Sequence, residues 1–209
     1  MSTNLWTSSA HALDYLSRAD SIPHRVEGES ALLEFIPPTV RRILDLGTGD
    51  GRLLALVKLD HPDAAAVALD FSPTMLEAAQ KRFDGNSSVT VRAHNLDRPL
   101  PALGKFDAVV SSFAIHHLTH ERKRELYAEV YRTLNLGGVF CNLEHVSSPT
   151  RDLHEEFLRR IGCTPETEDP SNKLLEVEIQ LAWLREIGFV DVDCFWKWRE
   201  LALLAGRKQ

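Results

Sequence analysis

The chain has few cysteines and no excess of positive charge. Only three cysteines occur among its 209 residues, and Cys141, Cys163 and Cys194 are widely spaced in apolar surroundings. Such a set is typical neither of a disulfide framework nor of a metal site, and it predicts reduced thiols in the cytoplasm. The formal net charge of −6 argues against a broad surface for nucleic acid or for an anionic membrane.

Long apolar runs are also missing. No segment approaches the ~18 consecutive apolar residues that a membrane span needs, and the start from Met1 to Trp6 lacks the basic and apolar regions of a secretory signal. We therefore expect a cytoplasmic protein. Its length is sufficient for one hydrophobic core, which predicts a single domain.

A glycine-rich loop between an apolar strand and an apolar helix is the most informative segment. Ile43 to Leu46 predict a buried strand, and Gly47, Gly49 and Gly51 follow it. Glycines allow the backbone to approach a ligand closely, at the carboxyl end of a strand where open α/β sheets bind ligands. The spacing is Gly-x-Gly-x-Gly, and Arg52 stands where a dinucleotide fingerprint has its third glycine.

Two carboxylates accompany these glycines. Asp45 precedes the first glycine and Asp50 lies within the loop. A carboxylate repels a pyrophosphate but attracts an ammonium or a sulfonium. The loop therefore predicts a nucleoside ligand with a cationic tail and no phosphates. The alternative is a plain tight turn in which Asp45 caps the next helix.

A second predicted strand, residues 65–70, ends in Asp70, 19 residues after Gly51. This is the spacing at which an acid meets ribose hydroxyls in βαβ nucleotide sites. Phe71 and Met75 flank it and are placed to lie against an adenine ring. The alternative role of Asp70 is to cap a helix that starts at Pro73.

Strand and helix patterns alternate along the chain, which predicts an α/β fold with a parallel sheet covered by helices on both faces. Residues 190–198 and 201–205 lack a helix between them and predict an antiparallel hairpin. The other expected strands are 89–95, 106–112 and 139–145, and the expected helices are 9–19, 28–36, 51–59, 73–83, 120–134, 151–161 and 173–187.

Five motifs in order between Arg41 and Val146 resemble those of the class I S-adenosylmethionine-dependent methyltransferases: "ILDLGTGDG", "ALD", "HNLD", "FDAVVSSFAIHHL" and "LNLGGVFCNLEHV". The resemblance implies a Rossmann-like, seven-stranded, mostly parallel sheet with an antiparallel C-terminal hairpin strand. It also implies S-adenosyl-L-methionine as cofactor and methyl transfer to an oxygen or nitrogen of a small-molecule acceptor.

Two other functions stay open. "SIPHR" and "CFWKWRELALLAG" loosely resemble parts of carboxy-S-adenosylmethionine synthase, which modifies the same cofactor. The carboxylate-binding arginine of that enzyme has no match here, since Lys173 is the only basic residue at the corresponding place. The third possibility is a catalytically silent protein that binds the cofactor.

The resemblance assigns cofactor contacts along the sequence. Asp45 and the glycine loop would face the methionine end, Asp70 the ribose, and Asn95 the adenine amino group, with Asp97 as the alternative if the strand register differs by two. The full predicted set is Arg25, Asp45, Gly47, Thr48, Gly49, Asp70, Phe71, Met75, Asn95, Leu96 and Ser112.

His116 and His117 follow the fourth predicted strand and His145 ends the fifth. The resemblance implies that both places border the substrate pocket. An oxygen or protonated amine acceptor needs a base, and His116 is the first choice for this role, with His145 second. The alternative is that they only pack or cap, as we expect of His120. A metal cluster of His116, His117 and His120 is disfavoured because no carboxylate or thiolate completes a ligand set.

Residues 1–38 predict an N-terminal helical lid, and 39–209 the methyltransferase domain. The segment from Tyr15 to Arg25 concentrates Tyr, Arg and His and has no obvious core stripe after Leu16. Arg25 is expected to bind a carboxylate of the cofactor or of a substrate, because a guanidinium matches that geometry. The alternative is a solvated surface arginine.

Overall fold

The computed structural model describes Trp6, residues 8–18 and residues 22–209. The helices are α1 (Ser9–Arg18), α2 (Arg25–Phe35), α3 (Arg52–Asp60), α4 (Pro73–Arg82), α5 (His120–Thr133), α6 (Arg151–Arg160) and α7 (Val177–Ile187). The strands are β1 (Arg42–Leu46), β2 (Ala65–Asp70), β3 (Val89–Ala93), β4 (Phe106–Ser112), β5 (Leu134–His145), β6 (Phe189–Trp198) and β7 (Leu201–Lys208).

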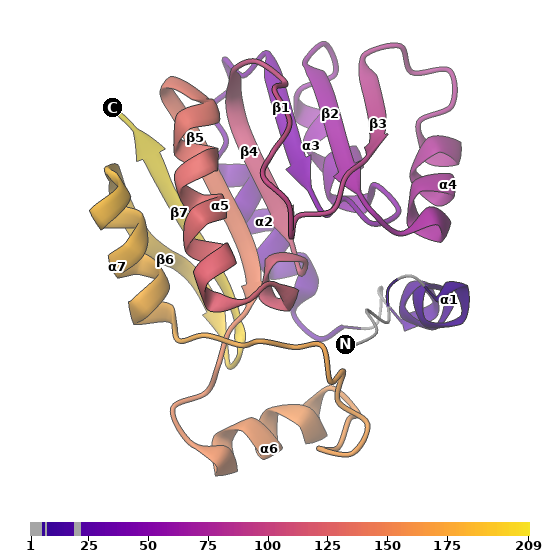
Figure 1. Ribbon diagram of the computed structural model, residues 1–209, viewed down its shortest axis with the longest axis vertical. Helices are drawn as coiled ribbons and strands as arrows, with labels where there is room; N and C mark the ends of the chain where they lie inside the picture. Colours follow the sequence, from indigo (N-terminus) through magenta and orange to yellow (C-terminus); the bar gives the residue numbers. More distant parts are fainter. Residues whose placement is uncertain (1–5, 7, 19–21) are drawn as a thin grey trace.

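The seven strands form one sheet in the order β3-β2-β1-β4-β5-β7-β6 (Figure 1). β1 pairs in parallel with β2 and β4, whereas β7 is antiparallel to both β5 and β6. A direct turn joins β6 to β7, so the two strands must run in opposite directions. The predicted α/β, Rossmann-like, mostly parallel sheet with an antiparallel C-terminal hairpin strand is confirmed.

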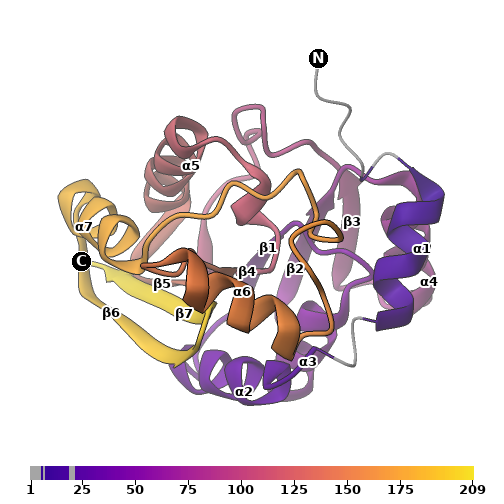
Figure 2. The same cartoon turned by 90° about the horizontal axis from the view of Figure 1, so that it is seen from below.

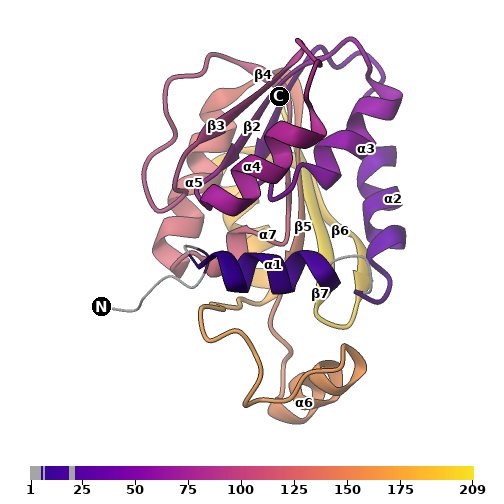
Figure 3. The ribbon, with the colours of Figure 1, turned by 90° about the vertical axis from the view of Figure 1, so that its right-hand side faces the viewer.

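Helices cover both faces of the sheet, with α2 and α3 on the side opposite α5 (Figure 3). Each face of the sheet has its own hydrophobic core. In one core, Val109 of β4 packs with Leu126 and Tyr127 of α5. In the other, the next residue, Val110, packs with Leu54 and Val57 of α3. All are fully buried. The middle strands therefore read as continuous apolar runs, as expected for a parallel sheet buried on both faces.

Several predicted boundaries are wrong. α2 begins at Arg25 rather than residue 28, directly after His24 in the left-handed region at φ 61°. α7 begins at Val177 rather than residue 173, because the preceding residues run extended and Lys173 N–H donates to His116 O at 2.9 Å. The cap of α5 is Thr119, whose Oγ1 accepts the Arg122 N–H at 3.3 Å, and not His120.

The parallel strands end at the lower edge of the sheet in Figure 1, and α1 and α6 lie beyond that edge. Figure 2, seen from below, shows both helices around the strand ends. The glycine loop after β1, the loop after β2 and the 3₁₀ turn Ile115–His117 after β4 therefore meet there. Within the described residues, none of the helices combines the length and apolar character needed to cross a bilayer.

Candidate active site

A cavity at this edge brings together the loops that follow β1, β2, β3 and β4. All eleven residues that the sequence assigned to the cofactor contribute to its wall, namely Arg25, Asp45, Gly47, Thr48, Gly49, Asp70, Phe71, Met75, Asn95, Leu96 and Ser112. Its wall also includes Trp6 and Tyr15 from the N-terminal segment and His117 from the 3₁₀ turn.

The glycine loop makes room for close packing beneath this cavity. Gly47 has φ +67°, and a Cβ there would lie 2.2 Å from the Ala114 Cβ. Only glycine both adopts this left-handed conformation easily and leaves room for the Ala114 side chain. The preceding Asp45 is buried and accepts a hydrogen bond from Thr48 Oγ1 at 2.5 Å. Burial raises the pKa of Asp45 to about 7, which favours a cationic ligand group beside it.

Asp70 joins two loops at the end of β2. One carboxylate oxygen accepts the Gly49 N–H and the other accepts the Ser72 N–H, both at 2.9 Å. Burial raises the pKa of this carboxyl as well. The cap position of α4 belongs to Ser72, so Asp70 braces the glycine loop, and each of its oxygens keeps further acceptor capacity for a ligand hydroxyl.

The loop after β3 closes the far end of the cavity. Asn95 Oδ1 accepts the Asp97 N–H at 2.9 Å, and both side chains belong to the cavity wall. Asn95 and Asp97 therefore both remain candidates for binding the adenine amino group. The prediction missed His94, whose Nε2 is buried without a hydrogen-bond partner among the described residues. Its only sequence signal was its place in the "HNLD" motif.

His94 Nε2 and Ser112 Oγ line the same cavity, and both are buried without a hydrogen-bond partner in the part of the chain that the structure describes. Buried polar groups in folded proteins are nearly always hydrogen-bonded. Together with the glycine cradle, the acceptor capacity of Asp70 and the buried carboxyl of Asp45, they fit a polar nucleoside with a cationic tail.

Arg25 lies at the start of α2 and is buried, so the solvent-exposed alternative is wrong. Its Nε donates to Glu29 Oε1 at 2.8 Å, and its guanidinium carbon lies 5.5 Å from the centre of the Phe113 ring. Glu29 also accepts from Arg52 Nε at 3.0 Å. Two guanidinium groups thus share the carboxylate of Glu29, and both arginines line the cavity.

A second cavity of about 200 Å³ adjoins the first. Four residues contribute to both walls, Trp6, Tyr15, Phe113 and His117. Phe113 holds the left-handed conformation, with φ 50°, and its N–H donates to Leu143 O at 2.8 Å. The junction between the cavities is therefore made of aromatic rings.

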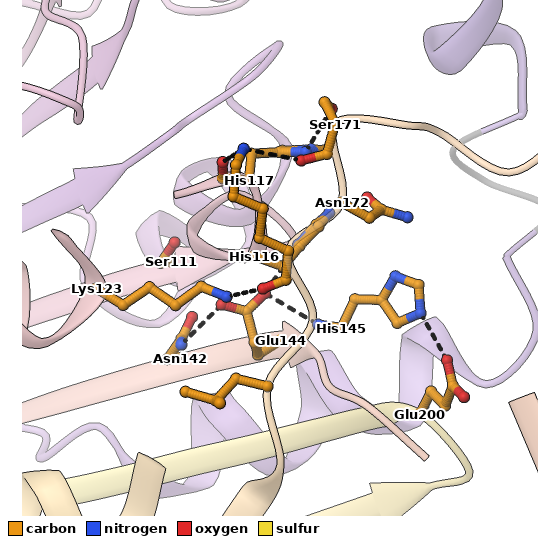
Figure 4. Close-up of polar contacts among 12 residues, drawn as sticks. Ser111, His116, His117, Lys123, Asn142, Glu144, His145, Ser171, Asn172 and Glu200 are labelled. Carbon is orange, nitrogen blue, oxygen red and sulfur yellow. Dashed lines mark hydrogen bonds and ion pairs between the residues drawn. The ribbon is translucent and has the colours of Figure 1, made fainter. Parts of the chain in front are cut away.

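His116 and His145, the two predicted bases, both lie in the wall of the second cavity. Figure 4 shows the polar contacts of their side chains. His116 Nδ1 lies 2.8 Å from Glu144 Oε1. That carboxylate is fully buried and also accepts the His145 main-chain N–H at 3.0 Å and Asn142 Nδ2 at 3.2 Å. Burial lowers the pKa of His116 well below its usual value, so the ring is neutral near pH 7.

The second predicted base has a carboxylate partner of its own. His145 Nε2 lies 3.0 Å from Glu200 Oε2 (Figure 4), and His154 Nδ1 of α6 lies 3.0 Å from Glu200 Oε1. Glu200 directly precedes β7, and His145 is paired in register with Leu201. The sheet register therefore brings together two side chains that lie far apart in the sequence.

His117, the residue after His116, also lines the second cavity. The pair lies in a 3₁₀ turn rather than on a strand, and the two ring centres are 4.0 Å apart. His117 Nδ1 lies 2.9 Å from Ser171 Oγ, and burial lowers its pKa well below the usual value.

The N-terminal segment covers the junction between the cavities. The Trp6 ring centre lies 5.2 Å from that of Tyr15 and 5.4 Å from that of His117. His11 Nε2 of α1 lies 3.4 Å from Asp169 Oδ2 in the loop after α6. The lid predicted for residues 1–38 remains a prediction. Residues 1–5, 7 and 19–21 lie outside the described part of the chain. Among the described residues, no group of three His, Cys, Asp or Glu is placed to hold a metal ion.

The chain belongs to the class I S-adenosylmethionine-dependent methyltransferases. Residues 43–138 match the model of the methyltransferase domain family. The protein is 31% identical to demethylmenaquinone methyltransferase of Roseiflexus castenholzii over 172 residues, covering 75% of this chain and 71% of that relative. S-adenosyl-L-methionine is its cofactor.

Two further comparisons reach over most of the chain. Carboxy-S-adenosyl-L-methionine synthase of Klebsiella pneumoniae is 25% identical over 202 residues, covering 85% of this chain and 82% of that enzyme. An O-methyltransferase family protein from Burkholderia thailandensis shares the fold with a TM-score of 0.75 at 21% identity. That alignment covers 98% of this chain but 61% of the other one, so the present chain spans under two thirds of its length.

Proposed function

We propose that the protein transfers a methyl group to an oxygen or nitrogen of a small-molecule acceptor, with His116 as the general base. The supporting observation is the His116–Glu144 pair in the wall of a cavity that adjoins the cofactor cavity. His145 is the second choice for the base, because it faces the same space and also has a carboxylate partner.

S-adenosyl-L-methionine, when bound, supplies an electrophilic methyl group on a sulfonium and leaves as S-adenosylhomocysteine. We assign its methionine end to Asp45, Gly47, Thr48, Gly49 and Ser112, with Arg25 placed for its carboxylate. Its ribose is assigned to Asp70, and its adenine to Phe71, Met75, Asn95 and Leu96. All of these residues line one cavity.

His116 would take the proton that the acceptor loses. A neutral ring that donates Nδ1–H to Glu144 keeps its Nε2 lone pair, and Glu144 stabilises the imidazolium that forms when Nε2 is protonated. The aromatic junction excludes water around the reacting groups and restricts the angle at which an acceptor approaches. Positioning of this kind supplies much of the rate for a transfer between two bound molecules.

Modification of the cofactor, as in carboxy-S-adenosylmethionine synthase, is the second candidate, because the similarity to that enzyme covers most of both chains. It would require a cation for the added carboxylate. No lysine or arginine among the described residues lines the second cavity, which favours methyl transfer.

One experiment separates the two candidates from a silent binding protein. The purified protein is extracted and the bound nucleoside is identified by mass spectrometry, and an acceptor panel is then screened for S-adenosylhomocysteine formation. Methylated products with increased mass support methyl transfer. A carboxylated nucleoside supports the synthase, and binding without turnover of any acceptor contradicts both. Action in the cytoplasm, away from nucleic acid, is part of the same proposal and rests on cysteine usage and charge.

A further inference from the structure

The second cavity has a size and a charge that restrict what it can hold. We infer that the acceptor is a single-ring aromatic alcohol or amine that carries no anionic group. The inference rests on the proposed function, because it treats this cavity as the acceptor site.

The size favours one ring. The cavity measures about 200 Å³, and an apolar cavity of about 150 Å³ in another protein holds benzene. A single ring with one or two small substituents therefore fills it. Larger acceptors would have to extend beyond this cavity.

The walls favour an aromatic acceptor. Trp6, Tyr15, Phe113 and Phe157 contribute rings from four separate parts of the chain. The His145 ring centre lies 5.2 Å from that of Phe157 at an interplanar angle of 46°. Aromatic rings pack against such walls in offset or edge-to-face arrangements and gain more than their buried area alone provides.

The charges of the wall disfavour an anion. Asp169 contributes directly to the cavity, while Glu144 and Glu200 lie behind His116 and His145. Among the described residues the lining contains no lysine or arginine, and both histidines after β4 are kept neutral by burial. A bound carboxylate would meet like charges without a cationic partner.

The ammonium groups of Lys123 and Lys173 are engaged with the main chain. Lys123 Nζ donates to Lys173 O, and Lys173 Nζ donates to His117 O at 2.7 Å and to Ser171 O at 3.2 Å. These bonds fasten residues 171–173 against the 3₁₀ turn. They leave neither lysine among the residues of the cavity wall.

The test compares two rings that differ by one carboxylate group. Catechol and 3,4-dihydroxybenzoate are titrated by calorimetry into protein saturated with S-adenosylhomocysteine. Catechol should bind about tenfold tighter or more, because like charges within a few ångströms repel strongly at a partly buried site. Equal or tighter binding of 3,4-dihydroxybenzoate, or binding of neither ring, overturns the inference. Cyclohexane-1,2-diol, which has no aromatic ring, should bind more weakly than catechol, and equal affinity would overturn the aromatic part.

A charge variant tests the cause. Asp169→Asn keeps an acceptor for the Ser171 N–H, which Asp169 Oδ1 now binds at 2.8 Å. It removes the negative charge, which also lies 3.4 Å from His11 Nε2. In this variant the ratio of the affinity for catechol to the affinity for 3,4-dihydroxybenzoate should fall by roughly threefold or more. Glu34→Gln on the exposed side of α2 removes the same charge far from the cavity and should leave the preference unchanged. An unaltered preference in Asp169→Asn overturns the role of this carboxylate.

The two proposals fail separately. If catechol binds preferentially but no methylated product forms with S-adenosyl-L-methionine, the proposed base catalysis is wrong for this nucleophile, and only the preference of the second cavity for an uncharged aromatic ring stands. If anionic acceptors are the ones methylated, methyl transfer stands and the inference is wrong.

Discussion

His116 Nδ1 lies 2.8 Å from Glu144 Oε1, and both side chains are buried. Two further donors, the His145 N–H and Asn142 Nδ2, hold the same carboxylate. A carboxylate fixed in this way keeps the imidazole in one orientation and one tautomer, so Glu144 acts as a positioning residue for His116.

We expect His116→Ala to lower kcat by roughly 10²-fold or more and to leave cofactor affinity nearly unchanged, because general-base catalysis contributes about that much. Glu144→Gln should also lower kcat with little effect on KM. His117→Ala is the control variant. Because His117 lines both cavities, this change should weaken cofactor binding, which His116→Ala should leave nearly unchanged. Full activity in His116→Ala would transfer the assignment to His145 or remove the base altogether.

Asp70→Ala should weaken binding of S-adenosyl-L-methionine at least about tenfold in calorimetry, since each hydrogen bond to a charged group contributes roughly 1.5–3 kcal/mol. The change also frees the Gly49 N–H, which Asp70 now holds at 2.9 Å. Asp70→Asn retains part of the acceptor capacity and should bind with intermediate affinity. An unchanged affinity in both variants would contradict the ribose assignment.

Cofactor affinity should depend on the protonation of Asp45. Burial raises its pKa from 3.8 to about 7, so the folded protein holds a proton between these pH values that the unfolded chain has released. The free energy of unfolding of the unliganded protein therefore falls as pH rises from 3.8 towards 7. Above pH 7 Asp45 causes no further loss. A cationic ligand prefers the carboxylate form, so its affinity should rise with pH, by at most about tenfold per unit, and level off above 7. Asp45→Asn should flatten this dependence in calorimetry, and an identical slope would exclude Asp45 as its source.

Gly47→Ala and Gly85→Ala form a matched pair, with φ of +67° and +75°. At Gly85 nothing lies within 4 Å of the added Cβ, so we expect only the cost of a left-handed residue, about 1–2 kcal/mol in urea unfolding. At Gly47 the Cβ would lie 2.2 Å from the Ala114 Cβ, and overpacking should bring the loss to about 3 kcal/mol or more. Equal losses would show that the contact with Ala114 relaxes freely.

Removal of residues 1–18 should leave a folded protein that retains S-adenosyl-L-methionine poorly, because Trp6 and Tyr15 belong to both cavity walls. The cut must spare Arg25, since Glu29 would otherwise lose a buried partner. Tyr15→Ala should reproduce part of the loss. Leu13→Ala, on an exposed side of α1, should not. Normal cofactor retention in the shortened protein would exclude a lid.

Local sequence patterns were sufficient to predict the strands of the sheet and the residues that line the first cavity. β2 and β4 occupy the predicted residues, because a strand buried on both faces is a continuous apolar run between turn residues. Ten of the eleven predicted cofactor residues lie at the ends of β1, β2, β3 and β4 or in the segments that follow them, so strand order brought these ten together. Arg25 of α2 is the exception.

The second cavity could not be predicted in the same way. Asp169 and Asn172 lie on a loop without hydrophobic periodicity, and they reach His116 and His117 only through contacts such as Ser171 Oγ with His117 Nδ1. The partner of His145 was equally hidden, because Glu200 is specified by the register of β5 against β7 and not by any local motif.

The position of β7 has a consequence for how the protein is made. β7 follows β6 in the chain but lies between β5 and β6 in the sheet. As the chain leaves the ribosome, β6 emerges before the strand on which it pairs, and the edge of β5 stays open until residues 201–208 follow. β1, β2 and β4 can pair earlier, so a nascent chain should acquire its nucleoside pocket first. His145 meets Glu200 only when β7 inserts, and Leu201 of the same strand lines the second cavity, so this cavity is completed after the nucleoside pocket.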